Sequence, residues 1–133
     1  MIEKSIRSAI NKMKQRGWDR IYFLVDIHDT IFKATYNEIE KYEWLGQAKE
    51  ALQKLTETPW IILILWSSSY DDTLKDYIKY FEKNNIRFDY INQNPEVENG
   101  ALGCFDKKPY FNVILDDKAG FSEEDWTKII QEI

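Results

Sequence analysis

Two uninterrupted apolar runs, IYFLV at positions 21–25 and WIILILW at 60–66, constrain the fold more than any other feature of the sequence. A strand with one face in water alternates apolar and polar residues, whereas a strand buried on both faces of a parallel sheet is apolar throughout. Each run is short, as strands are, and polar residues follow each run directly. Both runs therefore predict central strands of a sheet that is covered on both faces.

Helical patterns stand before, between and after these runs. Apolar residues share one helical face over 2–16, and Gly17 should end this helix. A second helix is expected over 48–55 and should end before Pro59. Further helices are expected around 72–81 and 122–133, with capping boxes predicted from Ser69 with Asp72 and from Ser122 with Asp125. The segments RFDYIN (87–92) and YFNVILDD (110–117) read as a third and a fourth strand. This alternation predicts an α/β fold with a parallel sheet and helices on both faces.

Size and composition bound the remaining possibilities. The 133 residues fit one domain, 1–133, with 92–110 as its longest irregular stretch. The net charge of −5 argues against binding to a nucleic-acid backbone. No apolar run approaches the roughly 18 residues that a membrane span needs, and the N-terminal residues lack the apolar core of a secretory signal. Cys104 is the only cysteine, which excludes an intramolecular disulfide and indicates a reducing, cytoplasmic location.

Three of the four expected strands end in polar residues that can carry chemistry. Asp26, His28, Asp29 and Thr30 follow the first strand, Ser67 to Ser69 follow the second, and the last ends in Asp116 and Asp117. In a parallel sheet the carboxyl ends of the strands share one edge, and ligands bind there. Carboxylates gathered without neutralising cations shift their pKa or hold a cation, and oxygen ligands suit Mg²⁺. The alternative is that these residues only cap helices and turns.

The order and spacing of these motifs resemble the haloacid dehalogenase-like (HAD) superfamily over almost the whole chain. Asp26 and Thr30 match the first and last positions of its Asp-x-Asp-x-Thr motif, and Ser67 in ILILWSSS matches its Ser/Thr motif. Asp116 and Asp117 in VILDD match its acidic pair. The proportions are similar to those of small capless members from bacteria and phages. The resemblance implies a three-layer Rossmann-like fold of about four parallel strands in the order 3-2-1-4, without a cap domain.

The resemblance also implies a Mg²⁺-dependent phosphomonoesterase that acts through a phosphoaspartyl intermediate. Asp26 would be the nucleophile, Ser67 would hydrogen-bond a phosphoryl oxygen, and Thr30 would hold the loop in shape. The implied Mg²⁺ ligands are Asp26, the backbone carbonyl of His28, Asp116 and Asp117. A cation is also what the chemistry requires, because an anionic nucleophile cannot otherwise approach an anionic ester. The implied partner is a phosphorylated substrate in an open site, with 92–110 as a partial lid.

Two features depart from the family pattern. His28 stands where the family has a second Asp, the general acid, and Asp29 stands where small residues such as Gly are usual. A histidine with an ordinary pKa of about 6.5 is able to act as the acid, so both a working and a non-catalytic His28 remain open. The family also has a lysine that contacts the phosphoryl group, and Lys118 is preferred for this position over Lys107 and Lys108. Lys108 precedes Asp116 by eight residues, about 25 Å if the chain is straight, so it would reach the site only if the loop folds back.

Two other functions remain as alternatives. The first is a catalytically weakened HAD-like protein that serves as a binding or regulatory module, which His28 and the displaced lysine favour. The second is a receiver-type phosphoacceptor domain. That family places its acidic pair after the first strand, whereas the pair here follows the last one, so this alternative is the weaker of the two.

Overall fold

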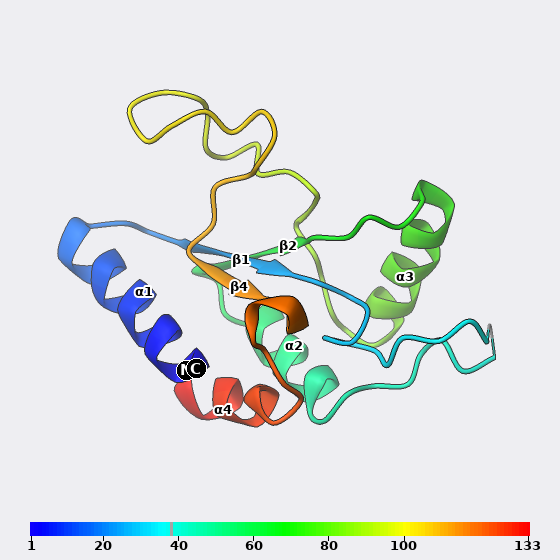
Figure 1. Ribbon diagram of the computed structural model, residues 1–133. Helices are drawn as coiled ribbons and strands as arrows, with labels where there is room; N and C mark the ends of the chain where they lie inside the picture. Colours follow the sequence, from blue (N-terminus) through cyan, green and yellow to red (C-terminus); the bar gives the residue numbers. More distant parts are fainter. Residues whose placement is uncertain (38) are drawn as a thin grey trace.

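The computed structural model describes residues 1–37 and 39–133 and contains a parallel sheet of four strands in the order β3-β2-β1-β4 (Figure 1). The predicted α/β class and strand order are confirmed, and the described residues form one small domain without a separate cap. None of the helices in the described part of the chain is long and apolar enough to span a membrane. The elements are α1 (Ile2–Arg16), β1 (Ile21–Val25), α2 (Ala48–Thr56), β2 (Ile61–Leu65), α3 (Asp71–Lys83), β3 (Tyr90–Ile91), β4 (Val113–Leu115), the 3₁₀ helix η1 (Asp117–Ala119) and α4 (Asp125–Glu132).

The strand register aligns the carboxyl ends of the three longest strands. Val25 of β1 pairs with Leu65 of β2 on one side and with Leu115 of β4 on the other. The ladder continues one step further, because the Asp26 N–H donates to the Leu115 carbonyl and the Trp66 N–H donates to the Val25 carbonyl. The first residues beyond the strands, Asp26 and Asp116, are therefore brought side by side.

One face of the sheet packs against all four α-helices. Ile21, Phe23 and Val25 of β1 point into a core that also contains the buried residues of α1, α2, α3 and α4. The largest of these side chains is Trp126 of α4, which is fully buried. Helices α1, α2 and α4 lie together below the sheet in Figure 1, and the two chain termini lie close to each other.

The second face is covered by a loop, so the prediction of helices on both faces is wrong. Tyr22 and Leu24 of β1 form a smaller cluster with Ile62 and Ile64 of β2, and partly buried residues of the segment 92–112 pack against it. The handedness of crossovers explains this arrangement. The connections from β1 to β2 and from β2 to β3 move across the sheet in one direction, so right-handed crossovers place α2 and α3 on one face. The connection from β3 to β4 returns in the opposite direction and must cross the other face.

The composition of 92–112 explains why this crossover is not helical. Pro95 and Pro109 each lack the backbone N–H that a helix interior needs, and Gly100 and Gly103 disfavour a helix between them. We call residues 92–112 the crossover loop. In Figure 1 it is the yellow segment that stands above the sheet.

Element ends differ from the sequence prediction in several places. Strands β3 and β4 have two and three residues, fewer than predicted. The predicted capping box from Ser69 is wrong, because α3 begins at Asp71 and its N-cap residue is Tyr70, whose side chain makes no capping hydrogen bond. The box at α4 is half formed, since the Asp125 carboxylate accepts from the Ser122 N–H at 2.9 Å. Gly17 ends α1 as predicted, with the left-handed φ of 68° that glycine adopts easily.

Candidate active site

Three carboxylates meet at the carboxyl edge of β1 and β4. One carboxylate oxygen from each of Asp26, Asp116 and Asp117 lies within 4.8 Å of the other two. Asp26 follows β1 directly, and the other two stand where β4 passes into η1. Asp116 also caps η1, because its carboxylate accepts from the Lys118 N–H at 2.9 Å. The strand register, rather than local sequence, creates this cluster.

The electrostatics of the cluster suit a cation. Burial, the negative charge of Asp116 and contact with Asp117 raise the pKa of Asp26 from 3.8 to about 6. Without a cation, the ionised form of Asp26 therefore lowers the stability of the fold. The converging donor atoms are all carboxylate oxygens, the ligands that a hard divalent cation such as Mg²⁺ prefers. The residues present thus fit the predicted metal.

Thr30 joins the turn after β1 to the turn after β4. Its hydroxyl accepts from the Asp117 N–H at 3.0 Å and lies 3.3 Å from an Asp26 carboxylate oxygen. The indole N–H of Trp126 donates to the Thr30 carbonyl at 2.8 Å. Because Thr30 is only 1% exposed, these contacts are shielded from water. Thr30 therefore fixes the nucleophile candidate relative to the acidic pair.

The turn after β1 explains why an aspartate is tolerated at position 29. Asp29 has a φ of 60°, in the left-handed region that glycine, asparagine and aspartate enter most easily. Its side chain accepts from the Ala34 N–H at 2.9 Å, and its own N–H donates to the Phe32 carbonyl. Asp29 therefore stabilises the turn and does not join the carboxylate cluster.

His28 contacts α3. Its Nε2 lies 3.1 Å from the hydroxyl of Tyr77, and the two rings meet edge to face. Tyr77 is nearly fully buried in the main core. The imidazole is thus tied to the aromatic side of α3, and His28 does not belong to the lining of the cavity beside the carboxylates.

A cavity of about 480 Å³ opens beside the carboxylates and collects most of the predicted site. Asp26 and Asp116 line it together with Ser67, Lys107 and Lys118. Lys107 reaches this cavity because the crossover loop folds back over the sheet. Lys108 does not line it, and its ammonium instead lies 5.4 Å from the centre of the Phe111 ring.

Ser68, from the predicted cluster Ser67 to Ser69, also lines the cavity, together with Trp66 and Asn92, which the sequence analysis did not single out. Asn92 follows β3 with a φ of 55° and exchanges two hydrogen bonds with the backbone of Ser67. The Ser67 N–H donates to the Asn92 amide oxygen, and the Asn92 amide N–H donates to the Ser67 carbonyl, both at 2.8 Å. The rule that ligands bind at the carboxyl ends of strands would have found Asn92 if applied to the third strand as well.

The fold and the site together define a small single-domain α/β protein with an acidic cluster, a serine and two lysines around one cavity at the carboxyl edge of its sheet. No known family model matches the chain, and no curated protein matches it. A matching solved structure is that of a conserved protein coded by a locus from Bacteroides thetaiotaomicron. It has a TM-score of 0.65 and 24% identity over 85% of this chain and 91% of that one. At this identity the likeness supports the fold alone.

Proposed function

We propose that this protein is a Mg²⁺-dependent phosphomonoesterase of the HAD type, with Asp26 as its nucleophile. The observation that carries the proposal is the composition of one cavity. It places a half-buried carboxylate beside a second carboxylate, and a serine and two lysines line the same space. A dianionic phosphoryl group needs cationic and hydrogen-bonding partners of this kind around it.

The reaction would proceed in two displacements at phosphorus. A carboxylate oxygen of Asp26 attacks phosphorus, and the bond from phosphorus to the ester oxygen breaks, with the electron pair leaving on that oxygen. Water then attacks the phosphorus of the resulting acyl phosphate, which releases inorganic phosphate and restores the Asp26 carboxylate. Bound Mg²⁺ would neutralise negative charge on both reacting partners. The residues that would hold it are Asp26, Asp116, Asp117 and, by the HAD resemblance, the backbone carbonyl of His28.

The remaining cavity residues would stabilise the phosphoryl group. The Ser67 hydroxyl would donate to a phosphoryl oxygen, and the ammonium groups of Lys107 and Lys118 would balance its charge. The paired hydrogen bonds from Asn92 hold the backbone of Ser67 in place. Preorganised donors of this kind act without reorganising during the reaction. We also propose a cytoplasmic location, on the ground of the single cysteine, Cys104.

The contact between His28 and Tyr77 favours an enzyme that lacks a strong general acid. With its imidazole on Tyr77 and outside the cavity lining, His28 would not protonate the leaving group. Aryl phosphates, whose leaving groups depart without a proton, should then be better substrates than alkyl phosphates. The same contact supports the second candidate function, a HAD-like protein that binds Mg²⁺ and phosphate groups without turnover.

The test is hydrolysis of p-nitrophenyl phosphate with and without Mg²⁺. The wild type should show metal-dependent turnover, and Asp26→Asn should abolish it. Asp19→Asn is the matched control, because Asp19 precedes β1 at the opposite end of the sheet and its side chain is 83% exposed. Calorimetric titration with Mg²⁺ should give much weaker binding to Asp116→Asn than to wild type. Mg²⁺ binding without any turnover would favour the binding protein, and equal affinity in both proteins would remove Asp116 from the ligand set.

A further inference from the structure

Residues of the crossover loop line a second, open cavity of about 400 Å³ that adjoins the first. Asn92 and Lys107 line both cavities, so the two spaces meet at these side chains. The volume lies in the range of ordinary small-molecule pockets. A phosphoryl group bound between Asp26, Ser67 and Lys107 would therefore have its ester substituent beside the entrance of the second cavity.

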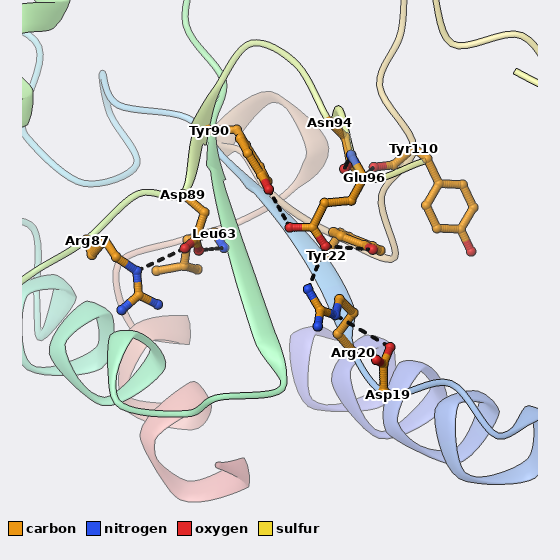
Figure 2. A network of polar contacts seen from close by, with 10 residues as sticks. All are labelled: Asp19, Arg20, Tyr22, Leu63, Arg87, Asp89, Tyr90, Asn94, Glu96 and Tyr110. Carbon is orange, nitrogen blue, oxygen red and sulfur yellow. Dashed lines mark hydrogen bonds and ion pairs between the residues drawn. The ribbon is translucent and has the colours of Figure 1, made fainter. Parts of the chain in front are cut away.

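The base of the crossover loop is fixed to the sheet, as Figure 2 shows. The Glu96 carboxylate accepts hydrogen bonds from the hydroxyls of Tyr22 on β1 and Tyr90 on β3, and it pairs with Arg20 at 2.8 Å. Burial would raise the pKa of Glu96, but the hydrogen bonds from Tyr90, Arg20 and Tyr22 hold it below its ordinary value. The buried Asn94 donates to the Tyr110 carbonyl and so ties the two ends of the loop together.

The outer part of the crossover loop is also held by its own contacts. Gly100 and Gly103 exchange two backbone hydrogen bonds and form a short hairpin. Asn99 bridges the two arms, because its amide oxygen accepts from the Phe105 N–H and its amide N–H donates to the Asp106 carboxylate. The Phe105 ring packs edge to face on Tyr110. The wall of the second cavity is therefore built from paired contacts at both its base and its tip.

The lining defines the chemistry that the second cavity accepts. It offers the amide of Gln93, the flat ring of Phe105 and the carboxylates of Glu98 and Asp106. Among the described residues that line it, Lys107 is the one cation, and Lys107 also lines the first cavity. Two carboxylates disfavour a second phosphate or another anionic group, whereas amide and carboxylate oxygens accept from hydroxyl and amide N–H groups. An aromatic face is suited to a ring.

We propose that the second cavity is the subsite for the leaving group of the substrate and takes a neutral, hydroxyl-bearing ring, such as a sugar or a nucleoside. This inference rests on the proposed function, since it assumes that the first cavity binds the phosphoryl group. It assigns substrate selection to the crossover loop, the element that covers the sheet face where a crossover helix was expected.

The test compares ligands that share one phosphoryl group and differ only in the substituent. Ribose 5-phosphate, uridine 5′-monophosphate and n-butyl phosphate are titrated by calorimetry, in excess Mg²⁺, into Asp26→Asn protein, which keeps both cavities but should not hydrolyse the ligands. At least one of the first two should bind about tenfold more tightly than n-butyl phosphate, a difference that one or two good hydrogen bonds supply. Tighter binding of ribose 5-phosphate would indicate a sugar as the substituent, and tighter binding of uridine 5′-monophosphate would indicate a nucleoside. Fructose 1,6-bisphosphate should bind more weakly than ribose 5-phosphate, and Glu98→Gln should narrow that gap.

Single substitutions test which residues of the second cavity produce the preference for a ring substituent. Phe105→Ala and Gln93→Ala should each lower the affinity for the tighter-binding ring ligand until it exceeds that for n-butyl phosphate by less than about threefold. The affinity for n-butyl phosphate itself should change less than twofold. Leu102→Ala is the control, because Leu102 lies at the hairpin tip, is 67% exposed and is outside the lining. Equal affinities for all ligands in the Asp26→Asn protein, or equal losses for all ligands when Phe105→Ala or Gln93→Ala is added to it, would overturn the subsite. Absence of p-nitrophenyl phosphate hydrolysis would refute only the proposed function, because the affinities are measured without turnover.

Discussion

Asp26→Asn should make the metal-free protein more stable at neutral pH although it should abolish turnover. Burial and the charge of Asp116 raise the pKa of Asp26 from 3.8 to about 6. Because the pKa is raised in the folded state, the full stability is present below about pH 4 and is lost as the pH rises through about 6. Above that pH the ionised Asp26 destabilises the fold. Asparagine has nearly the same shape without the charge, and its amide oxygen still accepts from Thr30.

The size of the effect follows from the rise in pKa. A pKa raised from 3.8 to about 6 corresponds to about 3 kcal/mol if the group is shielded from solvent. Asp26 is only half-buried, and solvent screening reduces this to roughly 1–2 kcal/mol. For a domain of this length, that gain is about 3–8 °C in Tm. At pH 4 the gain should fall below about 0.5 kcal/mol, because the wild-type carboxyl is then protonated in the folded state.

The assay is urea unfolding of wild type and Asp26→Asn in EDTA at pH 8 and pH 4, repeated at pH 8 with Mg²⁺. Mg²⁺ should stabilise the wild type more than the variant and so reduce or reverse the difference, since an ion that binds only the folded state adds stability. The exposed Asp19→Asn loses only a surface ion pair with Arg20 and should change the free energy of unfolding by less than about 0.5 kcal/mol at either pH. The reasoning fails if Asp26→Asn gains no stability at pH 8, or if it gains as much at pH 4.

Three further predictions concern single positions. Gly46→Ala should lower the free energy of unfolding, measured in urea, by about 2–4 kcal/mol, because φ is +51° and a Cβ would lie 2.6 Å from the Glu123 carbonyl oxygen. Gly17→Ala is the control and should lower it by only about 1 kcal/mol, because φ is +68° but the space around the new Cβ is open. Lys107→Ala should lower kcat for p-nitrophenyl phosphate roughly 10²-fold, and Lys108→Ala should stay within about twofold; equal losses would contradict the cavity assignment. His28→Ala should keep kcat for an alkyl phosphate within about threefold while His28→Asp raises it roughly 10²–10⁴-fold; a large loss in His28→Ala would make the imidazole a working acid.

The central sheet could be predicted because its sequence signal is strong and its geometry is simple. The runs at 21–25 and 60–66 are apolar at every position, and both strands are fully buried. Once two such strands are parallel, the residues that follow them must lie at one edge. The convergence of Asp26 with Ser67 and Asp116 therefore follows from strand ends alone, and the structure places all three around one cavity.

The contact between Asn92 and Ser67 at the end of the third strand was harder to predict, because β3 has only two residues. Tyr90 and Ile91 pair with Ile64 and Leu65 of β2, and this register puts Asn92 level with Trp66. Asn92 is the last residue of the predicted third strand and the first of the irregular stretch 92–110, and the sequence contains no sign that its amide binds the backbone of Ser67. That contact spans 25 positions along the chain and depends on a register that short strands specify weakly.

Whether Lys107 reaches the first cavity depends on the path of the crossover loop, and residue spacing alone does not determine that path. A straight strand from Lys108 to Asp116 would place the lysine about 25 Å from the site. Only Val113–Leu115 are in fact in a strand, so the chain before them is free to bend. Because the connection from β3 to β4 must recross the sheet on the face without helices, it passes above the carboxyl edge on its way. The anchors at Glu96 and Asn94 then fix which part of the loop lies beside the cavity. The strand order thus brings Lys107 of the crossover loop to the cavity, in addition to Lys118, which directly follows the acidic pair.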